Sequence, residues 1–226
     1  MKITFLGTGA ADWPLERPSE YTEFRRLSSA LIDETLLIDP GPQVPAALAA
    51  LQKDPAGIRF VINTHRHSDH FSAETLAGLE AAGAAFIPLT AGEERVLGKY
   101  TLRAYRANHG TATDAIHFLI SDGEKTLFYG LDGAWLLYDE VQAIKTHKPD
   151  LAVLDGTIGE QGGDYRIFEH NNLRMVREMQ MTLAPYVGRF CISHMARKLH
   201  PDHRTLSEQM AGTNILVAYD GMEIEI

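Results

Sequence analysis

The chain has 226 residues, of which 45% are hydrophobic and 23% charged, as in an ordinary globular protein with a substantial core. Its 21 Lys and Arg residues stand against 30 Asp and Glu residues, and the resulting net charge of −9 disfavours general binding to a nucleic-acid backbone, because that affinity comes from basic side chains. A single cysteine, Cys191, excludes an intrachain disulfide, and no apolar run approaches the ~20 residues needed to span a bilayer. We therefore expect a cytoplasmic protein without membrane contact. The unusual feature of the composition is its ten histidines.

Short β-like segments alternate with helical patterns along the chain. In chain order, strands are expected at residues 2–6, 30–32, 35–38, 59–62, 85–88, 101–105, 115–120, 126–129, 151–154, 189–193, 215–218 and 222–226. Helices are expected at residues 44–51, 72–81, 134–144 and 171–183. Because no linker or low-complexity tract interrupts this pattern, we predict one domain over residues 1–226. The hairpin-like strand pairs favour a layered α/β protein over a purely parallel sheet.

The strongest functional signal is the segment Thr64-His65-Arg66-His67-Ser68-Asp69-His70, which follows an apolar strand. Three imidazoles and a carboxylate on one short loop can converge on a point, and they form a ligand set suited to Zn²⁺, Fe or Mn²⁺. A single ion cannot easily take all four ligands from so short a loop. The alternation therefore indicates two ions, with His65 and His67 reaching one and Asp69 and His70 the other.

Further ligand candidates stand where other expected strands end, which is the usual place for active sites in α/β proteins. They are His109, Asp132 and His194. Each has an ordinary alternative, since a lone loop histidine is usually a surface residue and an Asp before Gly often caps a helix or makes a turn. Their recurrence at strand ends is what makes them candidates.

This pattern, HxHxDH after a strand and then a His, an Asp and a final His, resembles the metallo-β-lactamase fold of dinuclear metal hydrolases. The resemblance runs from Phe5-Leu6-Gly7-Thr8-Gly9 through Leu37-Ile38-Asp39-Pro40-Gly41 to Tyr219-Asp220-Gly221-Met222-Glu223-Ile224. It implies a four-layered αββα sandwich with two divalent metal ions at one edge between the sheets, zinc first and manganese or iron as alternatives. By this resemblance the first ion is held by His65, His67 and His109, the second by Asp69, His70 and His194, and Asp132 bridges them.

Within that superfamily, the N-terminal Gly-Thr-Gly, the closing Asp-Gly-Met-Glu-Ile and the segment Phe168-Glu169-His170-Asn171-Asn172 are most similar to phosphoribosyl 1,2-cyclic phosphate phosphodiesterases and their RNase Z-like relatives. The resemblance implies that His170 acts near the leaving group, whereas the alternative is a helix-start residue without chemistry. Relatives can hold a structural zinc with cysteines in the N-terminal loop. Residues 9–27 contain no cysteine, so that zinc site is expected to be absent and the exact substrate stays open.

We therefore expect a phosphodiesterase that hydrolyses a small phosphodiester, such as a ribose cyclic phosphate, by attack of a metal-bridging hydroxide. The expected catalytic residues are His170 and Asp69. Asp39 and Asp220 are expected to orient ligand imidazoles through hydrogen bonds to their second nitrogen. The expected substrate contacts, chosen for their nearness in sequence to ligands, are Arg66, Lys198 and His200.

Several other functions remain alternatives. An RNase Z-like nuclease is disfavoured by the acidic charge and by the short stretch between Asp132 and His170, which leaves little room for an arm that grips RNA. A hydrolase of another ester class also stays open. A flavodiiron-type oxidoreductase would carry Glu in place of His67, and a non-enzymatic binding protein would seldom keep all the ligand positions. The expected partner is a small phosphoester, not an extended nucleic acid, with a homodimer left open.

Overall fold

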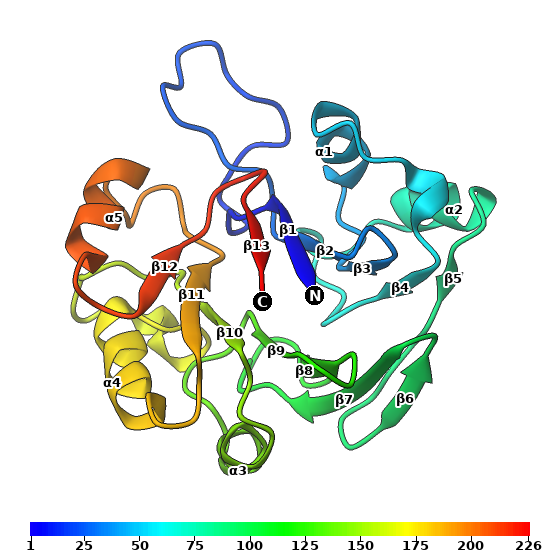
Figure 1. The fold of residues 1–226 in the computed structure, drawn as a ribbon. Coiled ribbons are helices and arrows are strands. Elements are labelled where there is room, and N and C mark those ends of the chain that lie inside the picture. The colour runs from blue at the N-terminus through cyan, green and yellow to red at the C-terminus, as the bar shows by residue number, and fades with distance from the viewer.

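The computed structural model describes all 226 residues and contains two β-sheets. The first sheet has six strands, in the spatial order β13 (Glu223–Glu225), β1 (Lys2–Gly7), β2 (Ser29–Ile32), β3 (Leu36–Ile38), β4 (Phe60–Ile62) and β5 (Ala85–Phe86). The second has seven, in the order β12 (Ile215–Val217), β11 (Arg189–Ser193), β10 (Leu151–Asp155), β9 (Thr126–Gly130), β8 (Ile116–Ser121), β7 (Tyr100–Arg106) and β6 (Glu94–Leu97). Figure 1 shows the two sheets facing each other.

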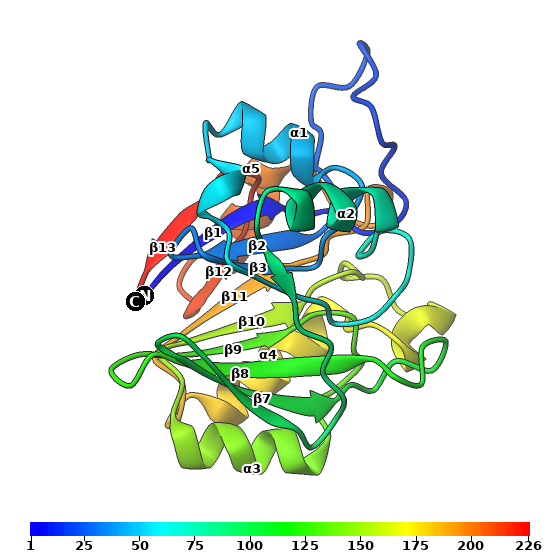
Figure 2. The same ribbon diagram turned by 90° about the vertical axis from the view of Figure 1, so that its right-hand side faces the viewer.

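Helices cover the outer face of each sheet, so the molecule has four layers, as the side view in Figure 2 shows. The first sheet is covered by α1 (Val44–Ala50) and α2 (Ala73–Ala81), and the second by α3 (Tyr138–His147), α4 (Leu173–Leu183) and α5 (His203–Met210). Two short 3₁₀ turns, η1 (Pro55–Gly57) and η2 (Tyr165–Phe168), lie in connecting segments. The predicted αββα architecture is confirmed.

Three clusters of buried apolar side chains fill the three spaces between the layers. The largest, of 22 residues, lies between the sheets and joins residues such as Ile3, Leu36 and Phe118. A cluster of 17 residues packs the second sheet against its helices, and one of 10 packs the first sheet against α1 and α2. Because the second sheet is covered on both faces, β10 is buried along its whole length and reads as a continuous apolar run.

The strand directions of the second sheet place one set of strand ends at a single edge. Strands β6 to β9 are antiparallel, whereas β9, β10, β11 and β12 are parallel neighbours. The carboxyl ends of β9, β10 and β11 therefore meet, and the chain emerges there at Asp132, at Asp155 and at His194. Side chains that are far apart in sequence converge at this edge.

The structure differs from the sequence-based elements in a few places. The expected helix at 134–144 begins at Tyr138 instead, because Asp132 and Trp135 adopt positive φ angles of 58° and 54° in the preceding turn. Strand β6 and helix α5 were not predicted. The N-terminus of α5 is capped by Asp202, whose side chain accepts a hydrogen bond from the Thr205 backbone N–H at 3.0 Å.

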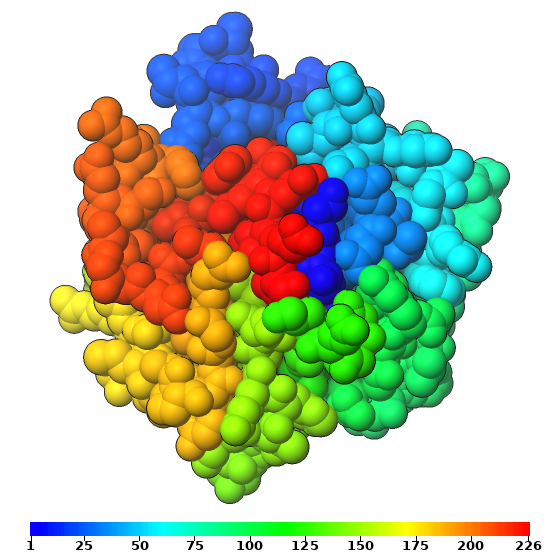
Figure 3. All heavy atoms as spheres, in the orientation of Figure 1, coloured from blue at the N-terminus to red at the C-terminus, as the bar shows by residue number.

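The two chain ends lie side by side on one face, where the Met1 amino group donates to the Ile226 carbonyl oxygen at 3.2 Å (Figure 3). They meet because β1 and β13 are antiparallel neighbours, with Lys2 opposite Glu225, so that the start of the first strand lies beside the end of the last. None of the helices combines the length and apolar character required to cross a membrane.

Candidate metal centre and its cleft

The His-rich loop after β4 is held in shape by a buried carboxylate, Asp39, at the end of β3. Its Oδ1 accepts hydrogen bonds from the backbone N–H of Thr64 at 2.7 Å and from the Thr64 hydroxyl at 2.9 Å. Its Oδ2 lies 2.8 Å from Nδ1 of His70. With Nδ1 donating to Asp39, the lone pair of neutral His70 is on Nε2, which points toward the strand-end edge. Asp39 thus occupies the orienting position predicted for it.

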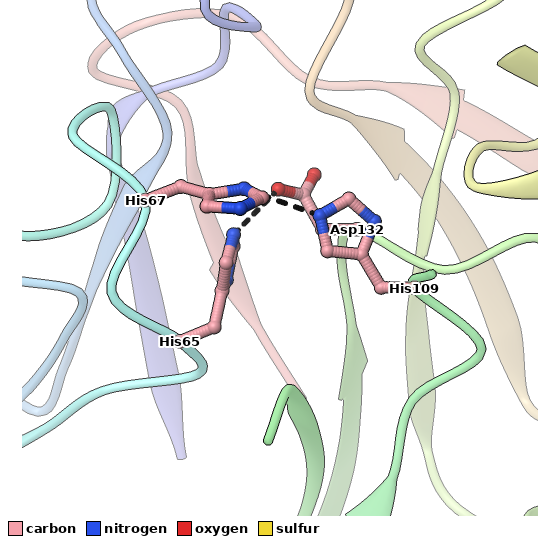
Figure 4. Close-up of side chains that lie close together, drawn as sticks. All are labelled: His65, His67, His109 and Asp132. Carbon is pink, nitrogen blue, oxygen red and sulfur yellow. Dashed lines mark hydrogen bonds and ion pairs between the residues drawn. The ribbon is translucent and has the colours of Figure 1, made fainter. Parts of the chain in front are cut away.

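Four side chains converge from three segments to form the first ligand group: His65, His67, His109 and Asp132 (Figure 4). His65 Nε2 lies 3.2 Å from Asp132 Oδ2, and His67 Nδ1 lies 3.2 Å from His109 Nε2. The imidazole of His65 is fixed from behind by the Thr64 hydroxyl, 3.1 Å from its Nδ1.

The second ligand group is completely buried and shares Asp132 with the first: Asp69, His70, Asp132 and His194. The Nε2 atoms of His70 and His194 are 3.2 Å apart. His70 Nε2 lies 3.0 Å from Asp132 Oδ2, and His194 Nε2 lies 2.9 Å from Asp132 Oδ1. The carboxylate of Asp132 therefore stands between the two groups, where a bridging ligand would be.

The spacing and the unsatisfied atoms of these groups fit divalent metal ions. Ligand atoms at 2.0–2.1 Å around a tetrahedral ion are about 3.3 Å from one another, and the distances above cluster near that value. His65 Nε2 and Asp132 Oδ1 are buried, and neither makes a hydrogen bond of proper geometry, although ligand atoms of the other groups approach them within 3.2 and 2.9 Å. Because such orphaned atoms are costly inside a protein, a cation at this point is the arrangement that satisfies them.

Three of these residues have backbone conformations that non-glycine residues rarely adopt. Asp39, Asp132 and His194 have φ angles of 62°, 58° and 63°. Each follows a strand end, and the left-handed conformation turns its side chain toward the common edge. Strain of this kind, on the order of 1–3 kcal/mol per residue, persists where the surrounding packing enforces it and is concentrated at functional sites.

The pKa shifts of the ligand residues reflect the buried negative charge of the second group. Burial by itself lowers a histidine pKa, and it does so at His109, whose pKa falls to about 4. At His194, burial is outweighed by the charge of Asp132, and the pKa rises to about 10. The pKa of Asp132 is held well below its usual value because neighbouring imidazoles outweigh its own burial. Such a site takes up cations, and metal ions displace protons from it.

His170 lies beside both ligand groups but is held by a different carboxylate. Its Nδ1 lies 2.8 Å from Oδ2 of Asp155, a fully buried residue at the end of β10. The hydroxyl of Thr157 lies 2.7 Å from Nδ1 of His194 and 3.0 Å from Asp155 Oδ2. Burial lowers the pKa of His170, but the charge of Asp155 outweighs that effect, so the net shift is upward and favours the cation.

These groups open into a cleft of about 210 Å³. His67, Asp69, His109, Asp132, His170 and His194 all line it. The remaining walls come from the N-terminal loop at Ala10–Asp12, from Thr111 and Thr157, and from the turn that bears Arg166 and Glu169. The cleft therefore brings together five of the seven predicted ligands and the predicted proton donor, while His65 and His70 lie behind its wall.

Four other predicted site residues lie elsewhere. Asp220 contacts no ligand imidazole, because its carboxylate accepts from the Thr8 hydroxyl at 2.8 Å and from the Arg26 backbone N–H at 2.6 Å. Arg66 and Lys198 are exposed and do not line the cleft; the Arg66 guanidinium lies over the ring of Phe71.

His200 is also outside the cleft. Its Nε2 donates to the carbonyl oxygens of Gly156 and Thr157, at 2.7 and 3.1 Å, and the residue lines a neighbouring cavity of about 340 Å³. Nearness in sequence to a ligand thus did not place Arg66, Lys198 or His200 in the cleft.

Sequence reasoning missed Thr157 and Arg166, which line the cleft, and Asp155, which is buried behind the cleft wall and contacts His170. A signal for Asp155 was present, since it ends an apolar strand that lies between the strands leading to Asp132 and His194. Polar residues at the ends of adjacent parallel strands meet at one edge. Thr157 and Arg166 carry no comparable signal, because their positions depend on how the loop after β10 returns to the cleft.

Comparison with known proteins agrees with this geometry. A model of the metallo-beta-lactamase superfamily matches residues 27–76, which include the His-rich loop. A search of curated protein sequences finds no match. Among solved structures, the metallo-beta-lactamase fold protein YhfI from Bacillus subtilis is 16% identical with a TM-score of 0.75, and the match covers 99% of both chains.

Two further structures share the fold over the whole chain. A diphosphatase from the PhnP family is 16% identical with a TM-score of 0.74, covering 100% of this chain and 97% of its own. The short form of human tRNase Z is 18% identical with a TM-score of 0.70, covering 100% and 99%. The chain thus has the metallo-β-lactamase fold, and its His/Asp groups fit a metal site of a hydrolase.

Proposed function

We propose that this protein is a zinc-dependent phosphodiesterase that hydrolyses a small, cyclic phosphodiester such as a ribose cyclic phosphate. The observation that carries the proposal is His170 in the wall of the cleft, next to both ligand groups and held from behind by the buried carboxylate of Asp155. A hydrolase for diesters needs a proton donor for an alkoxide leaving group, and this pair supplies one in addition to the metal ligands.

The chain's own residues divide the work of the reaction. Divalent ions held by His65, His67, His109, Asp69, His70, His194 and Asp132 supply Lewis-acid charge and an activated water. Asp155 accepts the Nδ1–H of His170 and so fixes the orientation of the ring. Every polar contact of the His170 imidazole is made through Nδ1, which leaves Nε2–H to donate a proton to the departing oxygen. General acid assistance of this type contributes roughly 10²–10⁴ in rate.

Zinc is favoured by the donor set. Five imidazole nitrogens with two carboxylates and no thiolate suit a borderline ion of tetrahedral preference, with manganese or iron as the alternatives.

Size and charge support a small substrate. A cleft of about 210 Å³ has room for a phosphoryl group and part of one alcohol. The net charge of −9 disfavours a long phosphate backbone, although the fold shared with a tRNase keeps pre-tRNA as the competing substrate.

The first test is metal analysis of protein purified without chelators, together with hydrolysis of bis-p-nitrophenyl phosphate. We expect close to two zinc ions per chain and an activity that a chelator abolishes. Asp132→Ala should abolish hydrolysis and lower the metal content, whereas Glu208→Ala, at an exposed position of helix α5, should change neither. Unimpaired hydrolysis by a metal-stripped protein would refute the mechanism.

The second test identifies the substrate class. Rates on a ribose cyclic phosphate, on 2′,3′-cyclic nucleotides and on pre-tRNA should fall in that order if the proposal is right. A kcat/KM for pre-tRNA above those for both small diesters would identify the protein as an RNase Z-like nuclease instead.

A further inference from the structure

The turn η2 places a permanent cation on the same wall of the cleft as His170. Arg166 belongs to η2 and lines the cleft. Its carbonyl oxygen accepts the backbone N–H of His170 at 2.7 Å. The backbones of Arg166 and His170 are therefore joined by one short hydrogen-bonded turn, which places the two residues next to each other on the cleft wall.

A neighbouring carboxylate aims the Arg166 side chain. Asp164 Oδ1 accepts both the backbone N–H and the Nε–H of Arg166 at 2.9 Å, and Asp164 Oδ2 accepts Nη2–H at 2.5 Å. Two parallel contacts of this kind fix the plane of a guanidinium. Nη1 makes no hydrogen bond within the protein, and the Arg166 side chain keeps 35% of its surface exposed. One edge of the fork is therefore available to a molecule in the cleft.

Arg166 is also the only Lys or Arg among the residues that line the cleft. Four carboxylates line it as well, from Asp12, Asp69, Asp132 and Glu169. Two divalent ions would offset these four negative charges and no more. Beyond the ions, the unpaired Nη1 edge of Arg166 is then the one Lys or Arg donor that the cleft wall offers to an anion.

We propose that Arg166 is a specificity-determining residue, which binds a non-bridging oxygen of the substrate phosphoryl group and makes the cleft select phosphodiester anions. This inference rests on the proposed phosphodiesterase function. A hydrogen bond from a charged donor to an oxyanion contributes on the order of 10- to 100-fold in binding. Arg suits this role better than Lys, because its planar fork matches the phosphate geometry and its orientation is fixed by Asp164.

The test compares four variants in the metal-loaded protein: Arg166→Met, Arg166→Lys, Asp164→Asn and, as control, Arg204→Met. Arg204 is 88% exposed on α5 and lies outside the cleft. Two quantities are measured: KM and kcat for bis-p-nitrophenyl phosphate, and the Kd of inorganic phosphate by titration calorimetry. Metal content is determined for each variant.

We expect Arg166→Met to raise KM and the phosphate Kd by about 10- to 100-fold with unchanged metal content. The KM and phosphate Kd of Arg166→Lys should lie between those of Arg166→Met and the wild type. The same is expected of Asp164→Asn, which keeps the positive charge of Arg166 but removes the carboxylate that fixes its guanidinium. Arg204→Met should behave as the wild type. Tyr165 and Phe168 on the same turn are 80% and 75% exposed, so the turn carries little core packing that a substitution could disturb.

The outcomes separate this inference from the proposed function. If the wild type hydrolyses the diester and Arg166→Met has the same KM and phosphate Kd, the role of Arg166 is refuted and the phosphodiesterase stands. If the wild type hydrolyses no phosphodiester, the phosphate titration decides alone: weaker binding by Arg166→Met supports the anion subsite, and equal or absent binding refutes it. Should Arg166→Met fail to fold, Arg166→Lys and Asp164→Asn give the same comparison.

Discussion

Glu140 and His117 form a buried pair beneath the turn that carries Asp132. Their side chains are 0% and 1% exposed, and His117 Nδ1 lies 2.5 Å from Glu140 Oε1. His117 Nε2 lies 3.0 Å from the carbonyl oxygen of Leu131, and Glu140 Oε2 accepts the backbone N–H of Leu137 at 2.7 Å. Both ring nitrogens of His117 thus face acceptors, which is the pattern of a cationic imidazole. The pair connects β8, α3 and the strand end before Asp132.

Glu140→Ala should lower the free energy of unfolding by about 3–5 kcal/mol, since removing one partner of a buried ion pair leaves the other uncompensated. The structure gives the origin of that figure: the buried His117 Nδ1–H loses its acceptor at about 1–3 kcal/mol, and the partly buried Leu137 N–H loses its acceptor as well. Such a loss is a large fraction of the ~5–15 kcal/mol stability of a typical domain.

The assay is urea unfolding followed by tryptophan fluorescence. The matched control is Glu208→Ala, which removes an exposed helix pair with Arg204 worth about 0.5 kcal/mol or less. A loss below ~1 kcal/mol for Glu140→Ala would mean that the pair does not hold the turn. Because Leu131 precedes Asp132, we also expect the variant to lose metal more readily than the control.

The effect of Glu140→Ala should depend on pH. Burial lowers the pKa of His117, but the charge of Glu140 outweighs it, so the folded-state pKa lies above the ordinary value of 6.5. A raised pKa contributes stability that is fully present below pH 6.5 and is lost as the pH rises through the folded-state pKa. The difference between wild type and Glu140→Ala should therefore be larger at pH 6 than at pH 9, and a constant difference would contradict the cationic assignment.

Three further predictions concern other parts of the molecule. Asp155→Asn should slow hydrolysis of alkyl phosphodiesters far more than hydrolysis of bis-p-nitrophenyl phosphate. The reason is that the variant no longer holds the His170 ring in place, and an alkoxide leaving group needs the proton of His170 more than p-nitrophenolate does. Equal losses of rate on both substrates would show that His170 is not the general acid. Gly78→Ala, at an exposed position of helix α2, should raise the thermal melting temperature and stabilise the protein by about 0.5–1 kcal/mol. Gly7→Ala should instead prevent folding, so that no cooperative melt is seen, because its Cβ would overlap the Leu27 carbonyl oxygen. Cys191 should resist a thiol reagent until the chain unfolds, since burial raises its pKa to about 12, and rapid labelling of native protein would contradict this.

Much of the architecture and all seven candidate ligands could be predicted from the sequence, because the information is local. A strand such as β10 is recognised from its own apolar run, and the His-rich loop places four donor side chains on one short segment. The residues His109, Asp132 and His194 were found because each follows a strand, a relation that is visible along the chain. Helix α5 was missed because its capping residue, Asp202, stands in a segment dominated by polar side chains.

The sequence by itself determined which chemistry the protein can host, since residue type and strand-end position define a metal-ligand set before any contact is known. Only the tertiary structure decided what surrounds that set. Asp39 reaches a ligand imidazole whereas Asp220, an equally good candidate, does not. Arg166, and not Arg66, lines the cleft. The physical reason is that these contacts depend on the direction of single side chains and on the packing of loops that are distant in sequence. The periodicity of the sequence contains no information about either.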